Sequence, residues 1–263
     1  MQAAPEQSSK PEETDLVGLA ERIVGGKLQP TQAKYMFSPE RVKWYVGRVG
    51  AAKTSSLCGS IILPALLYPG SRWLVARWTY WTLQETTMKR FDECMKRLGP
   101  NAIVDEIAGP PRKIWIAPAV VGFDGKPGEP SEIIFHSLDE LTKLGSTEFT
   151  GIGVDEANEI DHAMAVTLNQ RLRHKRPGLE KPEGPFFLNL ASNPPDELHW
   201  LHLNFCDDEG TEPEKMGAKF TPQLNENLEN LPDGYYTEIA KGMSPQMGIR
   251  MIEGPCGPAP TGK

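Results

Sequence analysis

The sequence contains little cysteine, no long hydrophobic run and no excess of positive charge. Only four of its 263 residues are cysteines, and no two of them form a C-x-x-C pair. This pattern indicates neither a zinc site nor a disulfide framework, so a reducing cytosol is the default compartment. The longest apolar run, IILPALL, is far too short to span a bilayer, and the first residues lack the pattern of a secretory signal.

The acidic composition restricts the range of partners. A net charge of −7 with 39% hydrophobic residues is that of an ordinary globular protein and argues against a general nucleic-acid coat. It does not argue against a local basic surface, because the run RLRHKR at residues 171–176 lies at the end of a helical pattern. It is either a DNA or subunit contact or a solvated helix end that the helix dipole favours. The cations concerned are Arg171, Arg173, Lys175 and Arg176.

Strand-like and helix-like segments alternate along most of the chain. This rhythm predicts an α/β fold with a mostly parallel central sheet and helices on both faces. The tryptophans Trp78 and Trp81 are expected to pack in the core or against the helix that follows, in preference to stacking on bases. The predicted strands are VKWYVG, RWLVARWT, KIWIAPAVV, EIIFHS, FTGIGVDEA and PFFLNLASNPP, the fourth pairing with the third as a hairpin. The predicted helices are DLVGLAERIVGG, SSLCGSIILPALL, LQETTMKRFDECMKRLG and MAVTLNQRLRHKR.

A phosphate-binding loop is indicated by YVGRVGAAKTSS, residues 45–56. The expected spacing is G-x-x-x-x-G-K-[ST], and Ala52 stands where the last glycine should be. A strand before it and a helix after it provide N–H groups and a helix dipole that favour an anion. Lys53 can then reach the β- and γ-phosphates, and the Thr54 hydroxyl can ligate Mg²⁺. The alternative is a tight turn with a solvated lysine. The predicted nucleotide contacts here are Gly47, Arg48, Gly50, Ala51, Ala52, Lys53, Thr54 and Ser55.

Two adjacent carboxylates end the strand-like segment GIGVDEANEI, residues 151–160. On a buried parallel strand, charged residues belong at the carboxyl end, where ligands bind. Asp155 is predicted to hold the metal through its water shell, and Glu156 to polarise the attacking water. A solvated pair at an ordinary strand end is the alternative.

A third polar strand end occurs in FLNLASNPP, residues 187–195. Ser192 and Asn193 follow a hydrophobic strand, and two prolines stop it. Small polar side chains at this place can sense the γ-phosphate between two strands. A plain turn is the alternative, because Ser, Asn and Pro all favour turns.

Five segments together resemble the ATPase domain of tailed-phage terminase large subunits. They are LQPTQAKYMFSPERVKWYVGR, RWLVARWTYWTLQETTMKRF, IIFHSLDELTKLGSTEFTGIGVDEANEI, SNPPDELHWLHLNF and FTPQLNENLENLPDGYYTEI, within residues 28–255. The resemblance implies a P-loop NTPase of the additional-strand, catalytic-glutamate type that uses ATP and Mg²⁺, with Gln32 as adenine reader. It divides the chain into an N-terminal tail and short helix (1–26), an ATPase core (27–206), and a lid subdomain with the start of a linker (207–263).

The family's activity implies a set of partners. The resemblance implies translocation of double-stranded DNA into a procapsid, with contacts to the portal and to the terminase small subunit. It also implies a homo-oligomeric ring that is a monomer in dilute solution, no membrane, and action in the cytoplasm of the infected bacterium. A neighbouring subunit usually lends an arginine, for which Arg112 is a candidate. The family's nuclease domain is expected to lie outside this chain, so no nuclease activity is expected.

The loop departs from the family pattern G-G-R-G-S-G-K-[ST] at two places. Arg48 is second where the family has its arginine third, which argues against an in-cis arginine role for Arg48. Ala52 adds a methyl group near them. Two alternatives are therefore a helicase-like ATPase, which needs a second ATPase-like domain, and an assembly scaffold with a ruined loop. Retention of Lys53, Thr54 and the Asp155–Glu156 pair argues against the scaffold.

Overall fold

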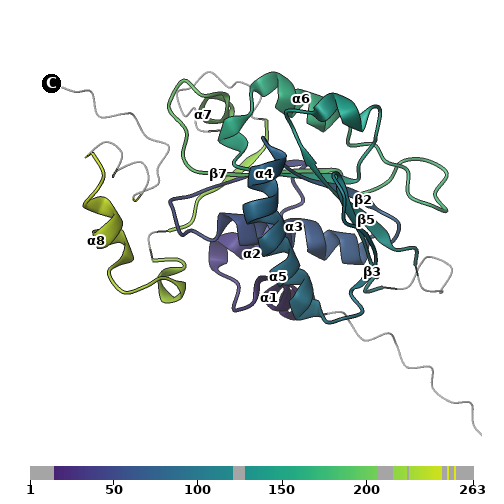
Figure 1. Cartoon of the computed structure of the whole chain (residues 1–263), viewed down its shortest axis with the longest axis horizontal. Coiled ribbons are helices and arrows are strands. Elements are labelled where there is room, and N and C mark those ends of the chain that lie inside the picture. Colours follow the sequence, from purple (N-terminus) through teal and green to yellow (C-terminus); the bar gives the residue numbers. More distant parts are fainter. Residues whose placement is uncertain are drawn as a thin grey trace, which may run out of the picture.

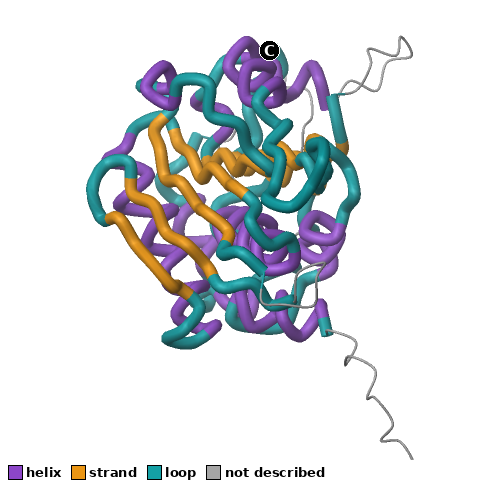
Figure 2. The backbone as a smooth tube through the Cα atoms, turned by 90° about the vertical axis from the view of Figure 1, so that its right-hand side faces the viewer, coloured by secondary structure: helices purple, strands orange, loops and turns teal. Residues whose placement is uncertain are grey.

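The computed structural model describes residues 15–120, 128–205, 216–223 and 225–244, together with Gly248 and Ile252. Its eight strands form a single twisted sheet with helices on both sides (Figure 1; Figure 2). The strands are β1 (Val42–Val46), β2 (Arg72–Arg77), β3 (Ile103–Ile107), β4 (Arg112–Ile116), β5 (Ser131–Ser137), β6 (Gly151–Asp155), β7 (Phe187–Ser192) and β8 (Ala218–Phe220).

The strand order is β3-β4-β5-β2-β6-β7-β1-β8. All pairs from β5 to β8 are parallel, which confirms the predicted mostly parallel sheet. β7 lies between β1, which leads into the glycine loop, and β6, which carries the two carboxylates. This is the additional strand that the resemblance implies. β4 pairs antiparallel with β5, as the hairpin prediction requires, and β3 is an edge strand that the sequence did not predict.

The helices cover the two faces of the sheet with two separate hydrophobic clusters. They are α1 (Leu16–Val24), α2 (Pro30–Phe37), α3 (Lys53–Leu67), α4 (Tyr80–Thr82), α5 (Lys89–Leu98), α6 (His162–Gln170), α7 (Trp200–Phe205) and α8 (Tyr235–Ala240). One cluster joins α1, α2, α3 and α5 to the sheet, and the other joins α6 and α7 to the opposite face (Figure 1). β1 and β6 are buried along their whole length, as expected of central parallel strands. No helix in the described part of the chain is long and apolar enough to cross a membrane.

Two predictions about local structure are wrong. α6 ends at Gln170, so the basic run 171–176 is not helical. Its chain instead forms a short parallel bridge, in which Phe149 pairs with Leu172. Trp78 and Trp81, which follow the carboxyl end of β2, are 40% and 70% exposed, so neither enters the core.

The C-terminal part of the described chain returns to the glycine loop. β8 pairs with β1 at the edge of the sheet, and the segment 221–240 then runs on to α8 (Figure 1). The carboxylate of Glu226 accepts hydrogen bonds from the backbone N–H and the hydroxyl of Thr31, at 3.0 and 2.8 Å. These buried bonds tie the segment to α2. The predicted domain boundaries stay predictions.

Candidate functional site

The glycine loop, residues 47–52, joins the end of β1 to the start of α3. Gly50 and Ala52 both have left-handed backbone conformations, with φ of 78° and 55°. Glycine adopts this region freely, whereas the Cβ of any other residue makes it costly. Ala52 therefore occupies the place of the missing glycine in a glycine-like conformation. The loop keeps its shape, and the first N–H groups of α3 stay free to meet an anion.

Lys53, the first residue of α3, has its ammonium directed back across the loop. Its Nζ donates to the backbone oxygen of Arg48 at 3.0 Å and to Oδ1 of Asn193 at 2.8 Å. Burial lowers the pKa of Lys53, while the nearby carboxylates of Glu156 and Asp155 work to raise it. Ser55, in the same first turn of α3, is half-buried. The sequence-predicted lysine and asparagine thus meet, although they are far apart in the chain.

Thr54 and Asp155 come together below the loop. The Thr54 hydroxyl lies 3.2 Å from Oδ2 and 3.4 Å from Oδ1 of Asp155. A hydroxyl and a carboxylate are hard oxygen ligands of the kind Mg²⁺ prefers, and phosphates usually complete its shell. Among the described residues, no group of three or more His, Cys, Asp or Glu side chains could hold a metal ion alone. The residues therefore fit a Mg²⁺ site that a nucleotide completes.

Glu156 follows Asp155 in a strained conformation. Its φ of 50° and ψ of 52° are left-handed, which for a residue other than glycine is uncommon and often marks a functional site. Burial, followed by the Asp155 carboxylate, raises the pKa of Glu156, while Lys53 and Arg77 oppose the rise. The Asn193 amide reaches Oε2 of Glu156 at 3.4 Å. Ser192 instead binds the indole N–H of Trp44 at 2.9 Å.

The side-chain amides of Gln32 and Gln29 differ in how many hydrogen-bond partners the protein gives them. Gln32 accepts the Gln29 backbone N–H at 3.1 Å and donates to the Ser56 hydroxyl at 3.2 Å. The side-chain amide of Gln29 donates to Oδ1 of Asn227 at 2.9 Å. Its buried Oε1 faces the Gln32 backbone N–H across the capping box of α2 but makes no hydrogen bond of good geometry, which is costly unless a ligand supplies one. Gln32, the predicted adenine reader, therefore has both amide atoms engaged, and Gln29 does not.

The side chain of Arg48 points away from the rest of the glycine loop and towards α8. Its guanidinium stacks 5.0 Å above the ring of Tyr236 and donates to the Tyr236 hydroxyl at 2.6 Å. It also donates to the backbone oxygen of Glu226 at 3.2 Å. The Tyr236 hydroxyl in turn donates to the backbone oxygen of Val49 at 3.0 Å. Arg48 therefore connects the loop to α8, in agreement with its unusual place in the motif.

The remaining predicted cations have different surroundings. Arg112 is held by Asp92 at 2.8 Å and Glu106 at 2.8 Å. Arg173 pairs with Glu148 at 2.7 Å, and Lys175 is exposed. Arg176 is buried, with its guanidinium 5.3 Å above the Tyr68 ring, and Arg171 has a buried Nη1. The four residues of the basic run therefore do not form one exposed surface.

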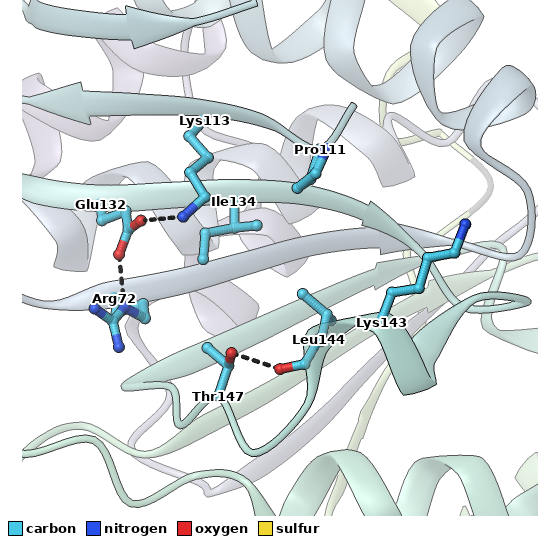
Figure 3. A pocket seen from close by; sticks show the side chains of 8 residues that line it. All are labelled: Arg72, Pro111, Lys113, Glu132, Ile134, Lys143, Leu144 and Thr147. Atoms are coloured by element: carbon cyan, nitrogen blue, oxygen red, sulfur yellow. Dashed lines mark hydrogen bonds and ion pairs between the residues drawn. The ribbon is translucent and has the colours of Figure 1, made fainter. Parts of the chain in front are cut away.

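A pocket of about 260 Å³ lies on the sheet near β2, β4 and β5 (Figure 3). None of its lining residues belongs to the glycine loop. Its one carboxylate, Glu132, already accepts from Arg72 at 2.6 Å and Lys113 at 3.0 Å. The single negative charge of Glu132 is therefore shared between two cations, both of which are engaged within the protein. It is lined by Arg72, Pro111, Lys113, Glu132, Ile134, Lys143, Leu144 and Thr147.

Sequence reasoning missed several side chains that contact the site. They come from distant segments and carry no motif: Gln29, Arg77, Thr87, Glu226, Asn227 and Tyr236. The sequence predicts LQETTM as the start of one amphipathic helix, so it gives no local signal that Thr87 contacts the site.

Comparison with models of known protein families identifies one family. A family model described as phage terminase large subunit matches residues 40–241. A search among curated proteins gives no match.

Solved structures show the same fold. The large terminase of the thermophilic bacteriophage D6E in complex with ADP has a TM-score of 0.67 and 13% identity, over 87% of this chain and 54% of that one. The same terminase with ATP-γ-S gives 0.65 and 13%, over 86% and 52%. The ATPase domain of the Thermus phage P74-26 large terminase gives 0.59 and 14%, over 89% and 95%. The chain thus spans about half the length of the first terminase and nearly all of that ATPase domain.

Proposed function

The chain belongs to the phage terminase large subunit family, and we propose that it hydrolyses ATP with Mg²⁺ to drive double-stranded DNA into a procapsid. The observation that carries the proposal is the meeting of Lys53, Thr54, Asp155, Glu156 and Asn193 at one edge of the sheet. Related terminases of known structure bind ADP and ATP-γ-S. The fold alone would not carry the function, because P-loop folds host many activities.

Binding of the nucleotide requires the lysine to change partners. Lys53 leaves the Arg48 carbonyl and Asn193 and turns to the β- and γ-phosphates, which the first N–H groups of α3 also bind. Thr54 and Asp155 are the residues that would hold Mg²⁺, the hydroxyl directly and the carboxylate through water. When bound, Mg²⁺ would neutralise negative charge that develops on the phosphates during transfer.

Hydrolysis rests on Glu156. Its carboxylate orients a water molecule in line with the γ-phosphate and accepts a proton from it. A raised pKa suits this role, because a stronger base takes the proton more readily, provided that the group is ionised at the working pH. Asn193, once released by Lys53, is free to contact the γ-phosphate while its amide still faces Glu156.

Adenine recognition is assigned to Gln29 in place of Gln32. An unpartnered Oε1 can accept the exocyclic amino group of adenine, and the amide nitrogen beside it can donate to a ring nitrogen. Guanine carries an oxygen where adenine has the amino group, so the same pair of atoms rejects it.

Assembly supplies what one subunit lacks. Lys53 brings one positive charge to the phosphates, and a neighbouring subunit in a ring brings the second. Arg112 can serve only if it leaves Asp92 and Glu106. The partners are double-stranded DNA, the portal of the procapsid, the small terminase subunit and further copies of the chain, in the cytoplasm of the infected bacterium. The chain has no nuclease activity, because its converging carboxylates serve the nucleotide.

The test is Mg²⁺-dependent ATP hydrolysis by the purified chain, with and without duplex DNA. Glu156→Gln keeps nucleotide binding and lowers hydrolysis by about 10²–10⁴-fold. Asp155→Asn instead raises the Mg²⁺ concentration required. Glu159→Gln, the same change three residues from the base, serves as control. Wild-type chain that neither binds nor hydrolyses ATP at any concentration would favour the scaffold, and stimulation by single strands alone would favour the helicase-like ATPase.

A further inference from the structure

A π-helical turn interrupts the helix that follows β2. α4 continues into the turn Leu83–Met88 and then into α5 without a break in the chain of helical hydrogen bonds. Such turns are rare and often occur at functional sites, because the extra residue redirects the side chains around it. Here the turn contains two adjacent threonines, Thr86 and Thr87.

The two threonine hydroxyls lie 3.4 Å apart and differ in their other partners. Thr87 is fully buried, and its Oγ1 donates to Oδ2 of Asp155 at 2.7 Å. This bond is shorter than the one from Thr54 to the same oxygen, at 3.2 Å. Thr86 is exposed, and its hydroxyl accepts from Nη1 of Arg77 at 2.8 Å. Of these two threonines, only Thr87 therefore contacts the Asp155 carboxylate.

We infer that Thr87 is a positioning residue that orients the Asp155 carboxylate for Mg²⁺. The inference rests on the proposed nucleotide site. Mg²⁺ accepts little deviation from octahedral geometry, so a carboxylate that acts through water must be held at a fixed angle. Asp155 is the last residue of a rigid strand, but its side chain can still rotate. The Thr87 bond comes from the π-helical turn, outside the glycine loop, and removes that freedom.

The cost of losing this bond can be bounded. Groups that hydrogen-bond to a metal ligand typically contribute 10–100-fold to metal affinity or activity. Thr54 alone would then hold Asp155, at a longer distance and while itself engaged with the metal. Losing this bond should weaken Mg²⁺ binding and leave binding of the metal-free nucleotide unchanged, because Thr87 lies outside the glycine loop.

Calorimetry of ADP binding, with and without Mg²⁺, separates a loss of metal affinity from a loss of nucleotide affinity. Thr87→Val replaces the hydroxyl by a methyl group of similar size. We expect ADP affinity in EDTA to stay unchanged and the gain in affinity on adding Mg²⁺ to fall by about 10–100-fold. Thr87→Ser keeps the hydroxyl and retains the gain. Thr86→Val, one residue away, also retains it. The Mg²⁺ concentration for half-maximal hydrolysis should shift in the same order.

Three results would overturn the inference. The first is a full Mg²⁺-dependent gain in Thr87→Val. The second is an equal loss of ADP binding with and without Mg²⁺, which would mean a structural role. If Thr87→Val does not fold, Thr87→Ala and Thr87→Ser differ only by the hydroxyl, and equal Mg²⁺ dependence of these two would be the third. A wild-type chain whose ADP affinity ignores Mg²⁺ would instead overturn the proposed function itself.

Discussion

The ammonium of Lys53 lies 2.8 Å from the side-chain oxygen of Asn193, and the same amide reaches Glu156 with its nitrogen. One asparagine directly after β7 thus links the lysine of the glycine loop to the carboxylate that follows β6. Without nucleotide, this link gives the half-buried ammonium a partner besides the Arg48 carbonyl, and gives the Glu156 carboxylate an amide donor. In the proposed mechanism, a bound nucleotide draws the lysine away, so the arrival of the phosphates changes the surroundings of Glu156. The residue that follows the additional strand would then connect binding to hydrolysis.

Lys53→Ala should abolish most nucleotide binding. The substitution deletes the charge aimed at the phosphates, and hydrogen bonds to charged groups contribute about 1.5–3 kcal/mol, or about 10–100-fold in affinity. Binding of a fluorescent ADP analogue measures the effect. Lys34→Ala, on the exposed side of α2, removes an equal charge and should bind normally. Equal affinity in both variants would mean that the loop does not bind phosphate.

Ala52→Gly should stabilise the protein, although it deletes a methyl group. A left-handed residue other than glycine costs about 1–2 kcal/mol, and Ala52 has a φ of 55°. The larger backbone entropy that glycine loses offsets about 0.5–1 kcal/mol of this gain. Urea unfolding should therefore show a stability increase of up to about 1 kcal/mol. MgADP affinity should also rise, because the methyl group near the phosphates is gone.

Gly50→Ala makes the opposite change two residues away. Its φ is 78°, and a Cβ there would lie 3.0 Å from a methyl carbon of Leu231. We expect a stability loss of about 1–2 kcal/mol. If both substitutions changed stability in the same direction, the backbone conformation of the loop would not be the cause.

Gln29→Leu should remove the preference for ATP over GTP. The Oε1 atom of Gln29 is buried and free for the adenine amino group, whereas Gln32 is engaged with Gln29 and Ser56. Competition binding should show about 10-fold weaker ATP binding in Gln29→Leu and little change for GTP. Gln32→Leu should instead lower the melting temperature and keep the base preference. If Gln32→Leu lost the base preference and Gln29→Leu kept it, Gln32 would be the adenine reader, as the sequence predicts.

Local patterns in the sequence were enough to predict the sheet. The apolar runs before Gly47, Asp155 and Asn193 are strands in the structure, and the helix after the loop begins at Lys53. Contacts between distant segments were not predictable in this way. Thr87 lies 68 residues before Asp155, and nothing in its neighbourhood points to a carboxylate. The prediction that the basic run is helical is wrong for a related reason. α6 ends at Gln170, and the backbone oxygen of Arg171 accepts a hydrogen bond from the distant Phe149 N–H.

The last prediction concerns Lys43, which is buried in the middle of β1. Its Nζ donates to the backbone oxygen of Ser38 at 3.2 Å and lies 4.0 Å above the ring of Phe187. Burial lowers the pKa of Lys43 to about 7, because no water hydrates the ammonium. In the unfolded chain a lysine keeps its proton up to a pH of about 10.4. Between pH 7 and 10 the unfolded state therefore holds the extra proton, and the contribution of Lys43 to stability rises with pH.

Lys43→Met should remove this pH dependence. Stability gained through one such group rises by about 1.4 kcal/mol per pH unit inside the window, and the slope vanishes below the folded-state pKa. Urea unfolding at pH 7, 8 and 9 should show the variant more stable than wild type at pH 7, with a difference that shrinks by about 2–3 kcal/mol at pH 9. All other groups titrate alike in both proteins, so the difference isolates Lys43. Lys34→Met, the same substitution on the exposed side of α2, should follow the wild-type curve. Parallel curves for Lys43→Met and wild type would mean that Lys43 keeps an ordinary pKa, stabilised as an ammonium by Phe187.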